Sequence, residues 1–355
     1  MTAITVPSAA VRFARPVLVA GCLGLSALLY GRDWKQAALW LALILLVRAL
    51  RHHRRIPLWL AVSLSLLPLL AVKTSLTGGI GLLGLSFATF RAIDMLLSEQ
   101  DGPPPPLPAS LLYLTFPPVL ITGPMLRWRD FSEDVQAWPR GMGRQPAAQG
   151  AAMLALGLIQ KFLCADLLQT YVLPTLPAHI YRPGLIVANA VAYSAFLYFD
   201  FAGYSNMMAG LCRLFGFRCP LNFRNPILSA DPRDFWRRWH ISLSEWLRDM
   251  VFFPLYRASQ RRPWLRAHRL LAQNGALFAT LFLMGTWNGL TPRYIASGAV
   301  FGLMSVTENS LTHLGQRWLW LKRFAASRPG GLCARLGTIS GALAALYLFS
   351  GRGPL

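Results

Sequence analysis

The stretch FWRRWHISL at residues 235–243 combines arginines, tryptophans and one histidine in a chain that is otherwise largely apolar. At 3.6 residues per turn, the tryptophans and leucines of residues 233–250 gather on one helix face and most charged side chains on the other. His240 lies against the apolar face in this arrangement. A histidine so placed is most often a packed or hydrogen-bonded core residue, so a catalytic role depends on the surrounding motifs.

The composition is that of a multi-spanning membrane protein. The chain has 355 residues, of which 54% are hydrophobic and only 14% charged, whereas soluble domains carry about 25% charged residues. Apolar runs long enough to cross or enter a bilayer recur along the chain. They are 15–30, 36–50, 56–74, 79–97, 107–126, 150–176, 184–204, 270–290, 294–310 and 336–350. We therefore expect an all-α, polytopic integral-membrane protein with a single domain over residues 1–355.

The net charge of +21 comes almost entirely from arginine, since only four of the 35 basic residues are lysines. The arginines cluster in loops between apolar runs, which is the positive-inside distribution, so the expected partner is an anionic lipid surface and not nucleic acid. The most basic loops, Arg48–Arg55, Arg257–Arg269 and Arg317–Arg335, are predicted to be cytoplasmic. The expected location is the cytoplasmic (inner) membrane, with multiple passes.

Several smaller features complete the expected organisation. Residues 1–16 contain no evident processing site, so the apolar run behind them is predicted to be a first span. The run GPPPPLP at 102–108 is expected to be a stiff connector. Prolines and glycines in 107–126 predict that this segment is not a regular helix and does not cross the membrane. The five cysteines are scattered without metal-ligand spacing, so no metal site is expected.

Ionisable residues inside apolar segments are costly and default to functional or paired positions. Arg91 and Asp94 lie three residues apart and are predicted to neutralise each other on one helix face. Lys161 is expected to be interfacial or paired. Asp200 is predicted to end a span before the Gly-Tyr-Ser break at 203–205, where it caps the next helix or orients an arginine of residues 233–248.

A second polar centre occurs in LMGTWNGL at residues 283–290. Gly285 and Gly289 are expected to permit close helix approach. Trp287 and Asn288 place an aromatic ring and an amide where a plain spanning helix has aliphatic side chains.

Together these motifs resemble those of membrane-bound O-acyltransferases. The resemblance covers roughly residues 70 to 310 and includes a long block at 199–249. It rests on GLSF and TFRA at 84–92, TGP at 122–124, FDFAGYS at 199–205, NF at 222–223, NP at 225–226, and DFW through WHISLS at 234–244. Alginate O-acetylation proteins share the 199–249 block, while GLSFATFRAIDM at 84–95 favours the D-alanyl-transferring branch.

The resemblance implies a ring of about ten transmembrane or re-entrant helices around a central tunnel. It implies an acyl thioester on the phosphopantetheine arm of an acyl (D-alanyl) carrier protein, with no cofactor bound by the chain itself. The acyl group passes to a hydroxyl acceptor, or to a partner transferase, on the extracytoplasmic side. The family uses two histidines, one at the position of His240 and one in a Trp-His-Gly line.

This sequence departs from the family at the second histidine, where it reads Trp287-Asn288-Gly289. Asparagine cannot take a proton from a hydroxyl near pH 7, whereas imidazole can. Three interpretations remain open. Asn288 positions the thioester while His240 is the base, the transfer needs no base there, or the protein has lost transfer and serves as a scaffold.

The resulting candidate residues fall into three groups. His240 and Asn288 are the catalytic candidates, and the expected tunnel residues are Trp239, Trp287, Ser242, Asp200 and Tyr204. The carrier-docking candidates are Arg257, Arg261, Arg262 and Arg266, because clustered arginines attract acidic partners. The alternatives to a D-alanyl transferase are a non-catalytic scaffold, a D-alanine export component and an alginate-type O-acetylation protein.

Overall fold

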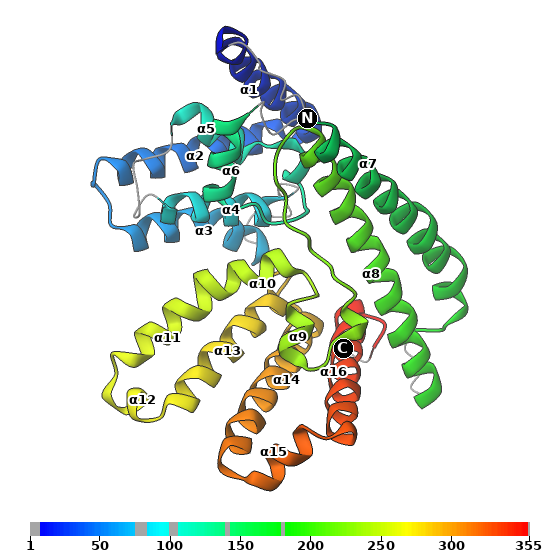
Figure 1. Ribbon diagram of the computed structural model, residues 1–355. Helices are drawn as coiled ribbons and strands as arrows, with labels where there is room; N and C mark the ends of the chain where they lie inside the picture. Colours follow the sequence, from blue (N-terminus) through cyan, green and yellow to red (C-terminus); the bar gives the residue numbers. More distant parts are fainter. Residues whose placement is uncertain (1–7, 75–83, 99–105, 139–142, 179–181, 354–355) are drawn as a thin grey trace. The chain divides into compact units, whose positions relative to one another are not determined.

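The computed structural model describes residues 8–74, 84–98, 106–138, 143–178 and 182–353 (Figure 1). Within these ranges the chain is helical, with no strand and a single isolated β-bridge. The all-α prediction is therefore confirmed. Residues 79–83 of one expected segment and 102–105 of the expected connector lie outside the described ranges.

The chain divides into two compact units, and each is described here by itself. Unit 1 comprises Met1–Leu156 and Ser205–Pro220, and unit 2 comprises Gly157–Tyr204 and Leu221–Leu355. Two of the three boundaries fall in long helices, because α7 (Arg144–Ile159), with its π-helical continuation, and α8 (Pro183–Leu214) each contribute to both units, and the third lies in the loop after α8.

Unit 1 is built from helices that pack around an apolar core. Its helices are α1 (Ser8–Tyr30), α2 (Trp34–His52), α3 (Leu58–Lys73), α4 (Leu85–Ser98), α5 (Leu107–Leu114) and α6 (Trp128–Ala137). Helices α2 and α3 form an antiparallel pair (Figure 1), and Val47, Ala61 and Leu96 are buried where α4 packs against them. Helix α5 stops at Leu114, and a 3₁₀ turn at Pro117–Val119 follows. The prediction that 107–126 is not a regular helix is confirmed.

The expected Arg91–Asp94 pair is wrong, although both side chains are buried. Arg91 donates to the backbone carbonyls of Tyr113 and Leu114, at 2.9 and 3.1 Å. Asp94 instead pairs with Arg127 at 3.1 Å and accepts hydrogen bonds from the Trp128 amide and the Tyr113 hydroxyl. Arg91 is thus bonded to the end of α5, and Asp94 to both α5 and the start of α6, so these two helices pack on α4.

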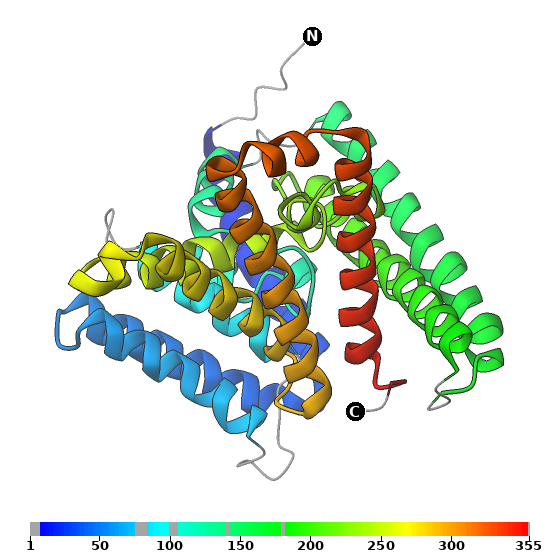
Figure 2. The same ribbon diagram turned by 90° about the horizontal axis from the view of Figure 1, so that it is seen from below.

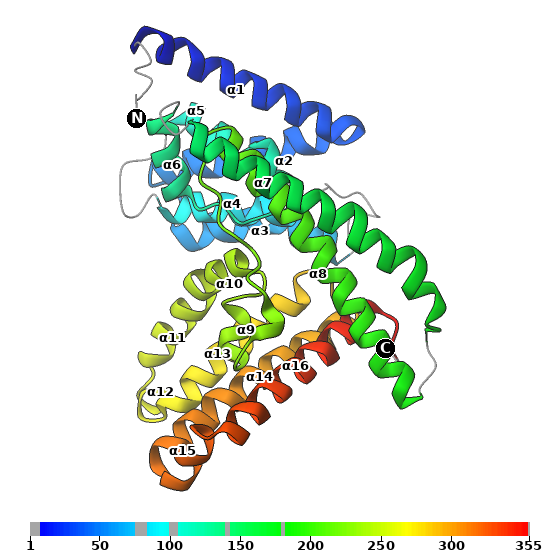
Figure 3. The same cartoon turned by 45° about the vertical axis from the view of Figure 1, so that its right-hand side comes forward.

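Unit 2 centres on three long helices. Its helices are α9 (Pro232–Trp236), α10 (Ile241–Leu247), α11 (Phe253–Gln260), α12 (Pro263–Ala267), α13 (Arg269–Thr286), α14 (Pro292–Arg317), α15 (Leu319–Ala325) and α16 (Arg328–Ser350). Helices α13 and α14 form a hairpin, and α16 returns along α14 after the short α15 (Figures 2 and 3). Asn274 near the start of α13 donates to Ser310 near the end of α14 at 2.9 Å, so the two flanking basic loops lie at the same end of the hairpin.

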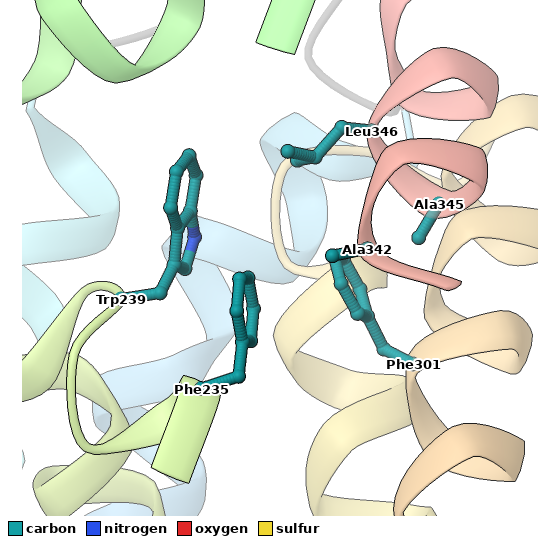
Figure 4. Packing of buried hydrophobic residues seen from close by; sticks show 6 residues of the cluster. All are labelled: Phe235, Trp239, Phe301, Ala342, Ala345 and Leu346. Carbon is teal, nitrogen blue, oxygen red and sulfur yellow. The ribbon is translucent and has the colours of Figure 1, made fainter. Parts of the chain in front are cut away.

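The core of unit 2 joins the FWRRWHISL stretch to this helical layer. Phe235 and Trp239 stack at 5.8 Å between ring centroids and face Phe301 of α14 together with Ala342 and Leu346 of α16 (Figure 4). Burying large aromatic side chains provides much of the packing energy of such a layer. The segment that carries His240 is therefore anchored to α14 and α16.

Asp200 lies inside α8, not at its end, so the predictions that it caps a helix or orients an arginine of 233–248 are wrong. It forms an ion pair with Lys161, which lies in a π-helical continuation of α7, Gln160–Ala165. Gly203, one turn further along α8, permits this approach, because a Cβ there would lie 2.6 Å from the Lys161 backbone nitrogen. The helix also continues without a break through 203–205.

Three described helical stretches are long and apolar enough to cross a membrane, namely Arg144–Thr175, Pro183–Leu214 and Arg328–Ser350. Two shorter apolar helices, Val17–Tyr30 and Leu58–Lys73, add to them. Little of the first stretch is covered by protein, and Phe162, Leu163 and Tyr171 are more than half exposed. Such exposed apolar side chains suit a lipid environment. The ring of about ten helices around a tunnel stays a prediction.

Candidate active site

The continuous amphipathic helix predicted over 233–250 is wrong, because the chain breaks in its middle. Helix α9 starts at an Asp231 cap, whose side chain accepts from the Asp234 amide at 2.8 Å, and it ends at Trp236. A turn follows, and α10 starts at Ile241 with His240 as its N-cap residue. Tertiary contacts override the helical periodicity here, and His240 lies at a helix junction.

His240 has a left-handed backbone conformation, with φ 46° and ψ 50°. Left-handed geometry is unfavourable for a residue with a Cβ and persists where the surroundings impose it. Asn225 is also left-handed, at φ 47°, and an antiparallel bridge between Phe223 and Trp239 joins the two segments. Two strained non-glycine residues thus flank one bridge, which is typical of a functional loop.

Asn222 holds this junction in place. Its backbone carbonyl accepts from the Ile241 amide at 3.0 Å, and its side-chain oxygen accepts from the Ser242 hydroxyl at 2.5 Å and the Ser242 amide at 3.3 Å. Asn222 and Ser242 are both buried. The first turn of α10, whose amide groups lack partners inside the helix, is therefore bonded to the preceding loop.

The His240 imidazole is 4% exposed, and neither ring nitrogen has a hydrogen-bond partner among the described residues. Its ring packs edge-on against Phe201 of α8, with centroids 4.6 Å apart. Burial lowers the pKa of His240 to about 3, so the ring is neutral at pH 7. A buried polar group without a partner costs about 1–3 kcal/mol, and this cost makes the imidazole a candidate functional group.

A cavity of about 840 Å³ lies beside this junction in unit 2. It is walled by α9 and α10 on one side and by α13 and α14 on the other, and its lining runs from Leu270 and Gln316 to Ser244 and Met284. Along α13 this distance is about 21 Å at 1.5 Å per residue.

His240 is buried, but it is not part of the lining of this cavity. Its neighbours Ile241 and Ser244 do line the cavity. The Ser244 hydroxyl donates to the His240 carbonyl at 3.1 Å and contacts the Met284 sulfur at 4.0 Å. The junction therefore forms part of the cavity wall, with the imidazole on the side that faces Phe201.

Asn288 lies in the turn that ends α13, four residues after Met284. The backbone of this turn is held by the Gly289 amide, which donates to the Thr286 carbonyl at 3.0 Å. Gly285 faces Gly298 of α14 so closely that a Cβ would lie 2.2 Å from the Gly298 Cα. The predicted close helix approach at Gly285 is confirmed, and Asn288 is half-buried just beyond it.

The remaining candidates are distributed over unit 2. Trp239 is buried in the core, Ser242 is bonded to Asn222, and Asp200 is paired with Lys161. Trp287 and Tyr204 are half-buried, and the four docking arginines, 257, 261, 262 and 266, are exposed on or beside α11 and α12. Asn222 and Phe201 could not be assigned a role from the sequence, because they contact the His240 junction from other parts of the chain.

Residues 34–349 match the membrane-bound O-acyltransferase family, and the chain belongs to this family. The family places the chain among acyltransferases.

The chain is 31% identical over 280 residues to the teichoic acid D-alanyltransferase of Bacillus subtilis, covering 77% of this chain and 69% of that protein. It is 34% identical over 260 residues to the enzyme of the same name from Streptococcus thermophilus, covering 70% and 62%. It is also 34% identical over 232 residues to the probable alginate O-acetylase AlgI of Pseudomonas aeruginosa, covering 64% and 43%. The chain thus spans between 43 and 69% of the length of these relatives.

Proposed function

We propose that this protein transfers an acyl group, D-alanyl in the first instance, from a thioester on the phosphopantetheine arm of a carrier protein to a hydroxyl acceptor beyond the cytoplasmic membrane. The observation that carries the proposal is the buried imidazole of His240, whose two nitrogens have no partner among the described residues. It lies on a strained junction that contributes to the wall of a large cavity. The names of the D-alanyltransferase relatives support the choice of acyl group.

In the proposed step, the acceptor hydroxyl oxygen attacks the thioester carbonyl. A C–O ester bond forms as the C–S bond breaks. His240 accepts the hydroxyl proton and passes it to the departing sulfur, which leaves as a free thiol. Because burial lowers the pKa of His240 to about 3, the ring starts neutral, and a lasting imidazolium is disfavoured. This favours prompt proton delivery to the thiolate.

Asn288 is proposed to position the thioester, in place of a second base. Its amide is a hydrogen-bond donor suited to the oxyanion that develops on the carbonyl. The glycine contact between α13 and α14 fixes the turn in which it lies.

The exposed arginines Arg257, Arg261, Arg262 and Arg266 are proposed to recruit the acidic carrier at the cytoplasmic face. Clustered positive charge accelerates association with an anionic partner and loses strength as salt rises. Placement of the Arg257–Arg269 and Arg317–Arg335 loops at one end of the α13–α14 hairpin is consistent with a shared cytoplasmic location.

The test is acyl transfer from a D-alanyl-loaded carrier in membranes that contain a known amount of the protein. We expect ester formation with the wild type, and a loss of about 10²–10⁴-fold with His240→Gln, which keeps a polar side chain but removes the base. Wild-type turnover equal to that of empty membranes, with the carrier still bound, would overturn the enzyme proposal in favour of a scaffold. Activity that appears only with Asn288→His would show that transfer was lost with the second histidine.

Polysaccharide O-acetylation is the second candidate, because the chain is 34% identical to probable alginate O-acetylases. The same membranes given acetyl- and D-alanyl-loaded donors in parallel distinguish the two. A clear preference for acetyl would replace the D-alanyl assignment and leave the His240 mechanism unchanged.

A further inference from the structure

The wall of the unit 2 cavity carries an uneven charge distribution. Four arginines and two glutamates line it: Arg224, Arg233, Arg237, Arg248, Glu245 and Glu308. Guanidinium groups hold their charge permanently and bind phosphate oxygens through paired N–H donors. The decisive question is which of these charges the protein already neutralises.

Two of the four arginines are paired within the protein. Arg233 donates to both carboxylate oxygens of Glu308, at 3.1 and 3.4 Å, and Arg248 pairs with Asp249 at 2.9 Å. Arg238, next to the cavity, binds both oxygens of Asp234 at 2.9 Å. These three guanidinium groups have intramolecular partners.

The side chains of Arg224 and Arg237 form no hydrogen bond or ion pair with any described residue. Both are exposed at the cavity wall, and Asp234 attracts Arg237 only at longer range. The backbone of Arg224 is nevertheless fixed, because its amide donates to the Arg238 carbonyl at 3.0 Å and its carbonyl accepts from the Arg238 guanidinium at 3.3 Å. A fixed backbone with a free cationic side chain is an arrangement suited to an anion supplied by a ligand.

The balance of free charges matches a monoanion. Against the two free arginines stands Glu245, a lining carboxylate that forms no ion pair with a described residue. The remaining balance is one positive charge, which suits a phosphodiester with its single negative charge better than a dianionic terminal phosphate.

The remainder of the wall suits an extended arm attached to such a phosphate. Leu277, Leu281 and Met284 give it an apolar side, and Ser244, Thr280 and Asn309 add hydrogen-bonding groups that amides can use. Ser244 connects this wall to the His240 junction.

We propose that Arg224 and Arg237 clamp the phosphodiester of a 4′-phosphopantetheine arm, and that the arm then runs along the cavity toward the junction. This inference rests on the proposed function, since it concerns the donor of that reaction. The same chemistry occurs in a carrier-bound arm and in coenzyme A, so the experiment separates the two sources.

The experiment compares two soluble donors, D-alanyl-4′-phosphopantetheine methyl phosphodiester and D-alanyl-pantetheine, which lacks phosphate. With wild-type protein we expect KM to be about tenfold lower or more for the phosphodiester. Arg224→Gln and Arg237→Gln should each reduce this preference, and the double variant should abolish it while kcat changes little. A preference that survives in the double variant, or equal KM values in the wild type, would overturn the proposal.

The matched control is Arg248→Gln, which removes the same charge from the same wall at a position that is already paired. This variant should retain the preference for the phosphodiester donor. A loss of preference as large as in Arg224→Gln would indicate that the total charge of the wall sets the preference, and would overturn a specific role for Arg224 and Arg237. The thermal midpoint of each variant checks folding.

A binding measurement separates this proposal from the proposed function. Calorimetric titration with the unacylated phosphodiester and with pantetheine needs no turnover. Selective binding of the phosphodiester without any transfer would support the proposed phosphate site and overturn the proposed enzymatic function. Transfer without selectivity for phosphate would support the enzymatic function and overturn the phosphate site. Loaded carrier and D-alanyl-coenzyme A, assayed in parallel, identify the source, because only the carrier should depend on Arg261 and Arg262.

Discussion

Two turns of unit 2 carry the catalytic candidates, and they are held in different ways. The His240 junction is fixed by hydrogen bonds, since Asn222 binds the first residues of α10 through its backbone and its side chain. The Asn288 turn is fixed by close helix packing, since Gly285 and Gly298 have no side chains and let α13 contact α14 directly. One turn is cross-linked by polar groups and the other is placed by close packing.

This difference indicates which kind of change each turn tolerates. Added volume should displace the Asn288 turn, because a Cβ at Gly285 meets backbone atoms that have no flexible side chain to move aside. Loss of a polar partner should release the His240 junction, where the strained backbone depends on hydrogen bonds. His240, which is proposed to move the proton, therefore lies on the turn that is held by specific hydrogen bonds.

Among the substitutions, the largest effect on stability is expected for Gly285→Ala. An ideal Cβ at this position lies 2.2 Å from the Gly298 Cα and 2.5 Å from its nitrogen, so α13 and α14 must separate. We expect a loss of about 3 kcal/mol in stability together with reduced transfer. Thermal unfolding in detergent and the transfer assay measure the two effects.

Gly275→Ala is the matched control on the same helix, because a Cβ there meets nothing within 4 Å. It should stabilise α13 by up to about 1 kcal/mol through helix propensity. Equal losses at both glycines would remove the distinction between a close-packed turn and an ordinary helix position.

The next effect concerns Asn222→Ala, which deletes the acceptor for both the hydroxyl and the amide of Ser242. We expect a loss of about 1–3 kcal/mol, because buried donors are left without partners. The kcat value should fall as the junction loosens.

Ser242→Ala should cost less, since the Ser242 amide keeps its bond to Asn222. A double-mutant cycle gives the coupling between the two side chains. Additive effects would show that the junction does not depend on this hydrogen bond.

The pH dependence of stability sharpens the comparison at His240 itself. Burial lowers the folded-state pKa to about 3 from an ordinary value of 6.5. The unfolded chain therefore binds a proton that the folded chain excludes between these values. The contribution of His240 to the free energy of unfolding should be fully present above pH 6.5. It should fall by about 1.4 kcal/mol for each pH unit between pH 6.5 and about 3.

His240→Gln should remove this component, and parallel pH curves for the wild type and the variant would contradict it. The transfer rate should show no loss from His240 protonation between pH 6.5 and 8, because the ring is already neutral there.

The smallest effect is expected for Asn288→His. The position is half-buried in a turn, so the fold should change by no more than about 1 kcal/mol. Transfer should be unchanged or rise, since His240 already provides the base and a histidine N–H can replace the Asn288 amide as hydrogen-bond donor. Loss of transfer in this variant would show that the Asn288 amide itself is required.

The sequence predicted the elements that depend on local pattern. Helical periodicity and composition indicated an all-helical membrane protein, and Gly285 indicated close helix approach. The break before His240 was missed, because apolar periodicity contains no information on a left-handed backbone imposed by Asn222 from another segment. A positive φ at a residue other than glycine leaves little trace in one sequence.

The wrong pairings share one physical cause. Arg91 and Asp94 were paired by proximity in sequence, yet Asp94 pairs with Arg127. Lys161 and Asp200 meet across two helices at a distance of 39 residues in the chain. A charge buried in a helical protein selects its partner by helix packing, which a single sequence does not reveal.

The π-helical segment Arg248–Phe252 joins α10 to α11 and bears on how the chain can change in evolution. A π-turn accommodates one residue more than an α-turn, so it is the structural mark of a single-residue insertion. Deleting one residue there would rotate everything that follows by about 100° around the helix axis. The direction in which α11 presents Arg257 is therefore set by the length of this five-residue segment. Deletion of one codon there would turn Arg257 to another side of the helix without substituting any residue of α11.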